Sequence, residues 1–281
     1  MSVAIVTDST ACLPAYRVEQ ASIRVVPVHV VIDDRTFSEG VDITSLAVNT
    51  ALRDGRVVTT SKPNPETFSA VYQDLALQGV TDIISVHLSS ELSGTYSAAV
   101  VAAREASLPV RVVDSRTVGL GLGFATLAAA DAVIAGKEVA EVADIAQRIG
   151  RGTRTWLCVE TLDYLRRGGR IGTAQAVVGS VLSIKPILEI AGGRVVPCDK
   201  VRTSARAQQR LVELAVQAAA ELGDSVEIGI QHAGAREVAE SLSVAMGRAL
   251  PGVPVVLADL GAVLSAHAGP GALAVIVSPV A

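Results

Sequence analysis

Hydroxyl side chains gather at two places in the first third of the chain. Thr60 and Ser61 lie in a predicted loop after a short apolar run. A second group lies where a predicted strand gives way to a helix, and consists of Ser93, Gly94 and Thr95. The N–H groups at the start of a helix bind anions, and hydroxyl groups add further donors. Taken alone, each segment is better explained as a turn or a helix cap. If the preceding strands are parallel, both segments meet at one edge of a sheet and can hold one small anion.

One histidine and two arginines are further candidates for binding an anion. His267 lies in a loop rich in glycine and proline, where it is less apt to fill a core and can donate a hydrogen bond to a carboxylate or phosphate. Arg170 follows two glycines and Arg202 precedes a predicted helix. A guanidinium group binds two oxygens of an anion at once, although both arginines could equally lie on solvated turns. The other histidines lie in or beside apolar strands and are predicted to be hydrogen-bonded core residues: His29, His87 and His232.

The composition argues against several other kinds of site. The 281 residues carry a formal charge of −4, whereas a nucleic-acid surface needs a basic face. The three cysteines are an odd number without a CxxC pair, so free thiols are expected rather than a disulfide framework or a zinc site. Apolar residues make up 50% but aromatic residues only 3%, which is typical of an aliphatic core built on a parallel sheet covered by helices.

Neither a signal peptide nor a membrane span is predicted. The first ten residues lack the basic and apolar regions of a signal peptide, so we expect a cytoplasmic protein. The most apolar segment, residues 118–135, consists largely of alanine and glycine and contains Asp131. Because alanine and glycine drive membrane insertion weakly, this segment is predicted to be a buried helix.

The elements that would position these groups alternate through the first half of the chain. Asn64 and Pro65 begin the most clearly marked helix, which keeps apolar residues on one face until Gly79. Strands are predicted at residues 3–6, 82–88 and 110–113, and further helices at 93–104, 117–135 and 138–149. This alternation predicts an α/β domain with a parallel sheet over residues 1–150.

The pattern changes after the glycines at residues 150 and 152, which mark the predicted domain boundary. A hairpin is predicted around Gly192 and Gly193, because paired glycines favour its tight turn. The other elements predict a second α/β domain with a mixed sheet over residues 151–281: strands at 155–159, 184–190, 194–198 and 226–230 and near 255 and 274, with helices at 204–222 and 236–250.

Eight short motifs occur along nearly the whole chain in an order that resembles the DegV family. They are VTDSTA at residues 6–11, TSKP at 60–63, LSGTY at 92–96, VDS at 113–115, GGRI at 168–171, IKPIL at 184–188, KVRT at 200–203 and HAGPG at 267–271. Each motif is weak by itself, but eight in the same order are hard to obtain by chance.

The resemblance implies a two-domain fold, with a three-layer α/β/α domain before the mixed-sheet domain, whose cleft holds a long-chain fatty acid. Thr60 and Ser93 would bind the carboxylate, while His267, Arg170 and Arg202 would line the head-group end or a docking face. The resemblance further implies that the chain is the lipid-binding subunit of a bacterial fatty acid kinase. Members of the family in this role act as follows. They present the carboxylate to a separate ATP-binding subunit, carry the acyl phosphate, contact the membrane surface at most transiently, and need no metal, cofactor or catalysis of their own.

Three positions depart from the pattern of the family. Cys12 stands where an acidic residue often follows TDSTA, Lys62 where TSQP is common, and Ala268 where HTGPG is usual. Cys12 and Ala268 remove polar groups near the expected site, whereas Lys62 adds a cation.

Two other functions remain open on the sequence alone. The chain could be a stand-alone enzyme acting on a small phosphorylated or carboxylated substrate, with His267 as acid or base and Arg170 and Arg202 as clamps. It contains no GxSxG, P-loop, HExxH or EF-hand motif that would support such a reading. A protein that only binds other proteins is the third possibility, and it would need no internal cavity.

Overall fold

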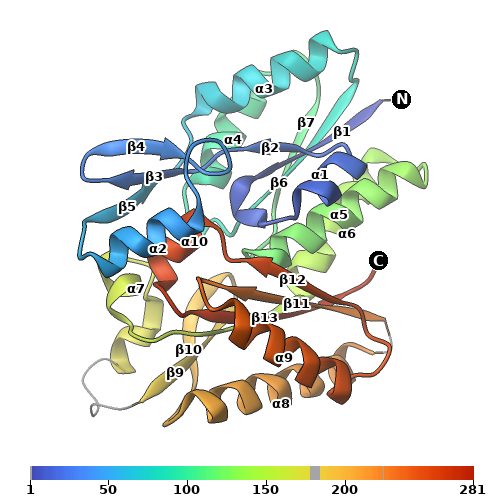
Figure 1. Cartoon of the computed structure of the whole chain (residues 1–281). Coiled ribbons are helices and arrows are strands. Elements are labelled where there is room, and N and C mark those ends of the chain that lie inside the picture. The colour runs from blue at the N-terminus through green and yellow to red at the C-terminus, as the bar shows by residue number, and fades with distance from the viewer. Residues whose placement is uncertain (1, 178–183, 224) are drawn as a thin grey trace.

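The computed structural model describes residues 2–177, 184–223 and 225–281. These residues form a four-stranded sheet from the first half of the chain and a six-stranded sheet from the second half, with a small three-stranded sheet beside them. In Figure 1 the four-stranded sheet lies in the upper half and the six-stranded sheet in the lower half. The predicted two-part α/β fold is therefore confirmed.

The four-stranded sheet is parallel throughout and has the strand order β2-β1-β6-β7. Its strands are β1 (Val3–Asp8), β2 (Arg24–Val26), β6 (Asp82–His87) and β7 (Val110–Asp114). Three of them confirm predicted strands, and β1 continues two residues beyond the prediction, to Asp8. The central strands are buried on both faces, as expected for a parallel sheet that helices cover on each side.

Helices pack on both faces of the parallel sheet and confirm the three-layer arrangement. On one face lie α3 (Pro65–Leu77) and α4 (Thr95–Arg104), with Phe68 and Tyr72 buried against the sheet. Asn64 caps α3 as predicted, because its Oδ1 accepts a hydrogen bond from the N–H of Thr67 at 2.9 Å. On the other face lie α5 (Leu120–Ile134) and α6 (Val139–Gly152).

The segment that carries Thr60 and Ser61 forms a strand, so its prediction as a loop was wrong. β5 (Val58–Ser61) pairs antiparallel with β3 (His29–Ile32), which also pairs antiparallel with β4 (Arg35–Ser38). Valine and threonine are β-branched and favour an extended backbone, and this preference outweighs the turn signals around them. The expectation that both hydroxyl segments follow strands of one parallel sheet is therefore also wrong.

The six-stranded sheet is mixed, with the strand order β10-β9-β8-β13-β11-β12. Only β11 and β12 pair in parallel, and all the other neighbours are antiparallel. The predicted hairpin is confirmed, with Gly192 and Gly193 at its turn. The strands are β8 (Arg154–Cys158), β9 (Lys185–Ala191), β10 (Arg194–Val201), β11 (Val226–His232), β12 (Val255–Asp259) and β13 (Leu273–Pro279).

One pair of helices is shared by the two large sheets. α5 and α6 pack against the parallel sheet on one side and against β11 and β13 on the other, as Figure 1 shows. The contact is close: a methyl group added at Gly229 would lie 2.9 Å from the Leu120 side chain. The predicted domain boundary after residue 150 falls in the last turn of α6. Both large sheets pack on this helix, so a boundary at this residue remains a proposal.

The apolar segment at residues 118–135 is a buried helix rather than a membrane span. Twelve residues of α5 are buried, and its sides are covered by both sheets. None of the helices in the described part of the chain is long and apolar enough to cross a membrane. α5 begins three residues later than predicted, because Gly119 before it has a φ of +65° and cannot be part of the helix.

The outer face of the mixed sheet is covered by the two predicted helices, α8 (Ser204–Leu222) and α9 (Arg236–Ala249). Several short helices were not predicted, because none of them is longer than nine residues. They are η1 (Ser9–Ala11), α1 (Ala15–Gln20), α2 (Ser45–Arg53), α7 (Asp163–Arg167), η2 (Gly172–Val177) and α10 (Ala262–Ala268). α10 packs against α2 and carries His267 on its last turn, so the predicted loop at this residue is a helix.

Candidate functional site

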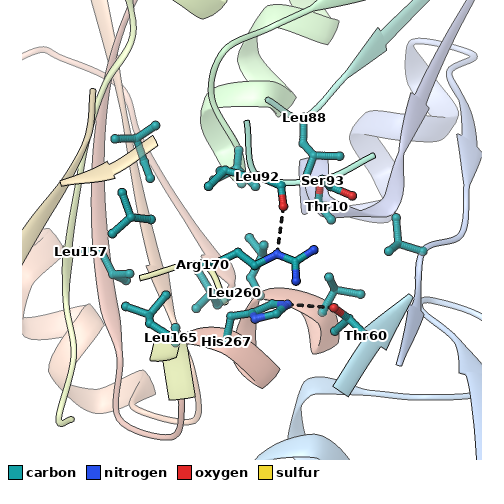
Figure 2. Close-up of a pocket in the computed structure, with 18 of the residues that line it drawn as sticks. Thr10, Thr60, Leu88, Leu92, Ser93, Leu157, Leu165, Arg170, Leu260 and His267 are labelled. Atoms are coloured by element: carbon teal, nitrogen blue, oxygen red, sulfur yellow. Dashed lines mark hydrogen bonds between the residues drawn. The ribbon is translucent and has the colours of Figure 1, made fainter. Parts of the chain in front are cut away.

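A cavity of about 170 Å³ lies between the parallel and mixed sheets. Its walls are mostly apolar, with Leu88 and Leu92 on the side of the parallel sheet and Leu157 and Leu165 opposite (Figure 2). Polar groups are few, and no carboxylate occurs among the described residues that line the cavity. An apolar cavity of this kind, with a small polar end, suits a ligand that is mainly hydrocarbon.

Thr60 and His267 form one polar pair in this cavity. The Thr60 hydroxyl lies 2.8 Å from Nε2 of His267, although the two residues are 207 positions apart in the chain. The other ring nitrogen, Nδ1, is buried, has no hydrogen-bond partner among the residues that the structure describes, and lies against Gly168. We therefore assign the ring proton to Nε2, which donates to the Thr60 oxygen. The hydroxyl proton of Thr60 then remains available to a ligand.

His267 is uncharged near neutral pH. Burial, together with the nearby positive charge of Arg170, lowers the pKa of its imidazole to about 4. A neutral ring can donate through only one nitrogen, and the hydrogen bond to Thr60 uses that donor. His267 is therefore suited to orienting Thr60 rather than to giving a proton to a substrate.

Ser93 lies across the same space from Thr60. Figure 2 shows the two side chains on either side of the Arg170 guanidinium. The Ser93 oxygen accepts a hydrogen bond from the N–H of Thr95 at 3.2 Å, although Gly94 rather than Ser93 is the N-cap of α4, and Ser93 also lines the cavity. Gly94 and Ser61 line it as well, whereas Thr95 is fully buried and contacts Ser93 instead, with the two hydroxyl oxygens 2.9 Å apart.

Arg170 reaches the centre of this group from the second half of the chain. Its Nε donates to the carbonyl of Leu92 at 3.0 Å, and Nη1 donates to the carbonyl of Gly168 at 2.6 Å. These bonds hold the guanidinium beside the loop that carries Ser93, with His267 next to it. The four side chains that come together are thus Thr60, Ser93, Arg170 and His267.

Arg202 does not belong to this group. It lies in a separate surface depression with Arg206 and Arg210, at the start of α8, and is exposed. Arg202 was expected either at the head-group end or on a docking face, and the structure places it away from the head-group end. The sequence pattern could not show this, because the strand that leads to Arg202 is at the edge of the mixed sheet.

Besides Lys62, which the sequence marked only as a departure from the family pattern, three polar residues of the cavity were not predicted as site residues: Thr10, Thr155 and Gln231. Thr10 belongs to the VTDSTA motif, which could have indicated it. Gln231 accepts a hydrogen bond from the N–H of Leu120 at 2.9 Å and so fixes the start of α5. Thr155 and Gln231 lie in apolar strands, and no spacing in the sequence sets them apart from core residues.

Thr10 is held by a buried chain of hydrogen bonds that includes a predicted core histidine. Its hydroxyl donates to Asp8 at 2.5 Å, and Nδ1 of His87 donates to the same carboxylate at 2.9 Å. Nε2 of His87 lies 2.8 Å from the Ser85 hydroxyl, which lies 2.9 Å from the hydroxyl of Tyr72. Asp8, His87 and Ser85 resemble a serine–histidine–aspartate triad, but all three are buried and none of them lines the cavity, so they do not reach a ligand there.

The other two histidines differ from one another. His29 is half-buried, with Nδ1 3.3 Å from the Ser38 hydroxyl. His232 is buried as predicted, but its Nδ1 has no partner in the part of the chain that the structure describes, so the prediction of a hydrogen-bonded ring holds less well there. The cysteines are free, as expected: Cys158 is buried and Cys12 and Cys198 are partly buried.

The protein is thus of the α/β class, with an apolar cavity between its two large sheets and hydroxyls and a guanidinium at the polar end of that cavity. The chain belongs to the DegV family, because the family model described as "Uncharacterised protein, DegV family" matches residues 2–280. It is 48% identical over 277 residues to a DegV domain-containing protein of Streptomyces coelicolor, covering 98% of each chain. It is 32% identical to protein DegV of Bacillus subtilis, again over 98% of each chain.

Solved structures of the family have the same fold. A DegV family protein from Thermus thermophilus, described for its fatty acid binding, superposes with a TM-score of 0.93 at 32% identity, covering 99% of this chain and 100% of the other. DegV of Bacillus subtilis, described as a fatty acid binding protein, has a TM-score of 0.91 at 31% identity, with 99% of both chains covered. Both the predicted family and the predicted fold are confirmed.

Proposed function

We propose that this protein binds a long-chain fatty acid, with the carboxylate between Thr60 and Ser93 and the hydrocarbon tail in the cavity. The observation that carries the proposal is one cavity in which apolar walls end at two hydroxyls and a guanidinium, with no carboxylate among the lining residues in the described ranges. The fatty acid binding described for the relatives from Thermus thermophilus and Bacillus subtilis supports it.

The proposed head-group contacts follow from the donors of the site. His267 donates to Thr60, so the Thr60 hydroxyl donates to one carboxylate oxygen. The Ser93 hydroxyl donates to the other, with Gly94 at the mouth of α4 beside it, and Arg170 offsets the negative charge. Burial of the tail contributes about 25 cal/mol per Å² of apolar surface, so most of the affinity comes from the hydrocarbon and the hydroxyls set its orientation.

The same proposal includes a separate ATP-dependent kinase subunit as partner, in the cytoplasm. The protein would present the carboxylate to that subunit, carry away the acyl phosphate and catalyse no step itself. The neutral His267, whose one donor is engaged by Thr60, is poorly placed to act as a general acid, which disfavours the stand-alone enzyme. Because Arg202 is exposed away from the cavity, we assign it to the docking face for the kinase.

Binding is tested with Thr60→Val combined with Ser93→Ala. Hydrogen bonds to a charged group contribute about 1.5–3 kcal/mol each, so we expect the loss of two to lower the affinity for palmitate by at least about 100-fold in titration calorimetry. The matched control is Thr59→Val with Ser97→Ala, which changes the same residue types in β5 and α4 at exposed positions outside the cavity. Equal affinities of the two double variants would refute the proposal that Thr60 and Ser93 bind the carboxylate.

Two further measurements test the cargo and the carrier role. Mass spectrometry of a lipid extract from the natively purified protein should find an acyl chain, and an extract without one, together with no binding of palmitate, would refute the proposal. The isolated chain, given palmitate and ATP, should form no acyl phosphate that hydroxylamine can trap. Formation of that product by the isolated chain would refute the non-catalytic role.

A further inference from the structure

Lys62 lies at the polar end of the cavity, on its exposed side. It follows Thr60 by two residues, immediately after β5, and its side chain crosses to the loop that carries Ser93. A methyl group added at Gly94 would lie 3.0 Å from Cδ and 3.2 Å from Nζ of Lys62, so the ammonium group rests against the start of α4. Lys62 thus spans the two segments of the proposed carboxylate grip.

Among the residues that the structure describes, no carboxylate forms an ion pair with the ammonium group of Lys62. The lysine ion pairs of the described chain involve Lys137 with Glu141 and Lys185 with Glu160, and none involves Lys62. Its charged neighbour along the cavity wall is another cation, Arg170. Two positive charges that line one cavity favour an anionic ligand that carries more than one negative charge.

A fatty acid and its acyl phosphate differ at this end only. The tail and the carbonyl group stay the same, while the acyl phosphate adds a phosphoryl group with a charge of about −2 in place of the single carboxylate charge. With the tail in the cavity and the carbonyl group at Thr60 and Ser93, the added phosphoryl group must project toward solvent, where Lys62 is exposed.

We infer that Lys62 binds the phosphoryl group and makes this protein favour the acyl phosphate over the free fatty acid. The inference rests on the proposed function and adds a residue that distinguishes the two forms of the cargo. An ammonium group suits this task because it is a compact point charge on a flexible stem, and can follow phosphate oxygens without fixed geometry. Arg170, held by two backbone carbonyls, lies deeper and serves both forms.

The test compares palmitate with hexadecyl phosphate, which has the same tail length and a stable phosphate ester. At about pH 8 this ester carries close to two negative charges. In Lys62→Gln we expect the affinity for hexadecyl phosphate to fall about fivefold or more, and that for palmitate by less than about twofold, since an exposed ion pair contributes modestly per charge. Lys62→Arg should retain most of the preference, and the exposed Lys137→Gln serves as the charge control.

The outcomes separate the inference from the proposed function. If the wild type binds neither ligand, the proposed function fails and the inference fails with it. If palmitate binds but Lys62→Gln weakens both ligands equally, or neither, the fatty-acid site stands and the role of Lys62 is refuted. A loss of the same size in Lys137→Gln would assign the effect to net charge and would also refute it.

Discussion

Substitution of Gly168 would disturb the proposed carboxylate site without changing a residue that contacts the ligand. A methyl group at this position would lie 2.1 Å from Nδ1 and 2.6 Å from Cε1 of His267, far inside normal contact distance. The backbone of Gly168 itself has a φ of −75°, which alanine adopts without strain. The Gly168→Ala variant therefore acts through the imidazole ring of His267.

The ring must move to make room, and its hydrogen bond to Thr60 at 2.8 Å then lengthens or breaks. The Thr60 oxygen then no longer accepts a hydrogen bond from Nε2 of His267, and its hydroxyl proton is no longer directed toward the ligand. Loss of one oriented hydrogen bond corresponds to about 1 kcal/mol, so we expect the palmitate affinity to fall about fivefold. Overpacking should lower the free energy of unfolding by about 1–3 kcal/mol.

The assay is titration calorimetry with palmitate, combined with urea unfolding of each variant. Gly247→Ala is the control, because a methyl group there meets nothing within 4 Å. In Gly168→Ala with His267→Ala the clash is gone, so the free energy of unfolding should partly recover while the affinity stays low. An affinity of Gly168→Ala equal to that of the wild type, despite the loss of stability, would refute the role given to His267.

Two other predictions concern stability. Gly193→Ala should destabilise the protein by about 2–3 kcal/mol, since the residue has a φ of +82° and a methyl group would lie 2.3 Å from Oγ of Ser89; Gly192→Ala, also at positive φ but with open space, should cost only about 1 kcal/mol, and equal losses in urea unfolding would contradict this. Burial raises the pKa of Glu227 from 4.5 to about 7, so the folded state binds more protons than the unfolded chain between these values and its stability falls as pH rises through them. Glu227→Gln removes this fall, so its stability relative to the wild type should increase by about 2 kcal/mol between about pH 4.5 and 7, a figure reduced for partial exposure, and a constant difference across that range would refute the assignment.

Much of the fold could be predicted because its long elements have clear periodicity. The helix that begins at Pro65, the hairpin at Gly192 and the buried strands of the parallel sheet each carry a local signal that the tertiary structure does not oppose. The short pieces could not be predicted. β3, β4 and β5 have four residues each, and α10 has seven, so their formation depends on packing against distant segments.

The candidate site shows the same limit at the level of single residues. Thr60 and Ser93 could be paired from the sequence, but for a reason that the structure overturns, since Thr60 comes from an antiparallel sheet. The sequence also placed His267 and Arg202 in the same set of candidates. Only His267 reaches the cavity, because α10 packs under β5 while Arg202 follows an edge strand. Spacing along the chain identified residue types suited to an anion, but not which of them converge.

The residues of the proposed carboxylate site come from both halves of the molecule, so binding of the fatty acid depends on how the halves are held together. Thr60 and Ser93 come from the first half, whereas Arg170 and His267 come from the second. The shared pair of helices, α5 and α6, fixes one side of the contact between the halves. A second contact between the halves is the hydrogen bond that Ser89 donates to the carbonyl of the turn residue Gly193 at 2.8 Å. A change that separates the halves would therefore part the hydroxyls from the guanidinium and the imidazole, and weaken the head-group contacts and the enclosure of the tail together.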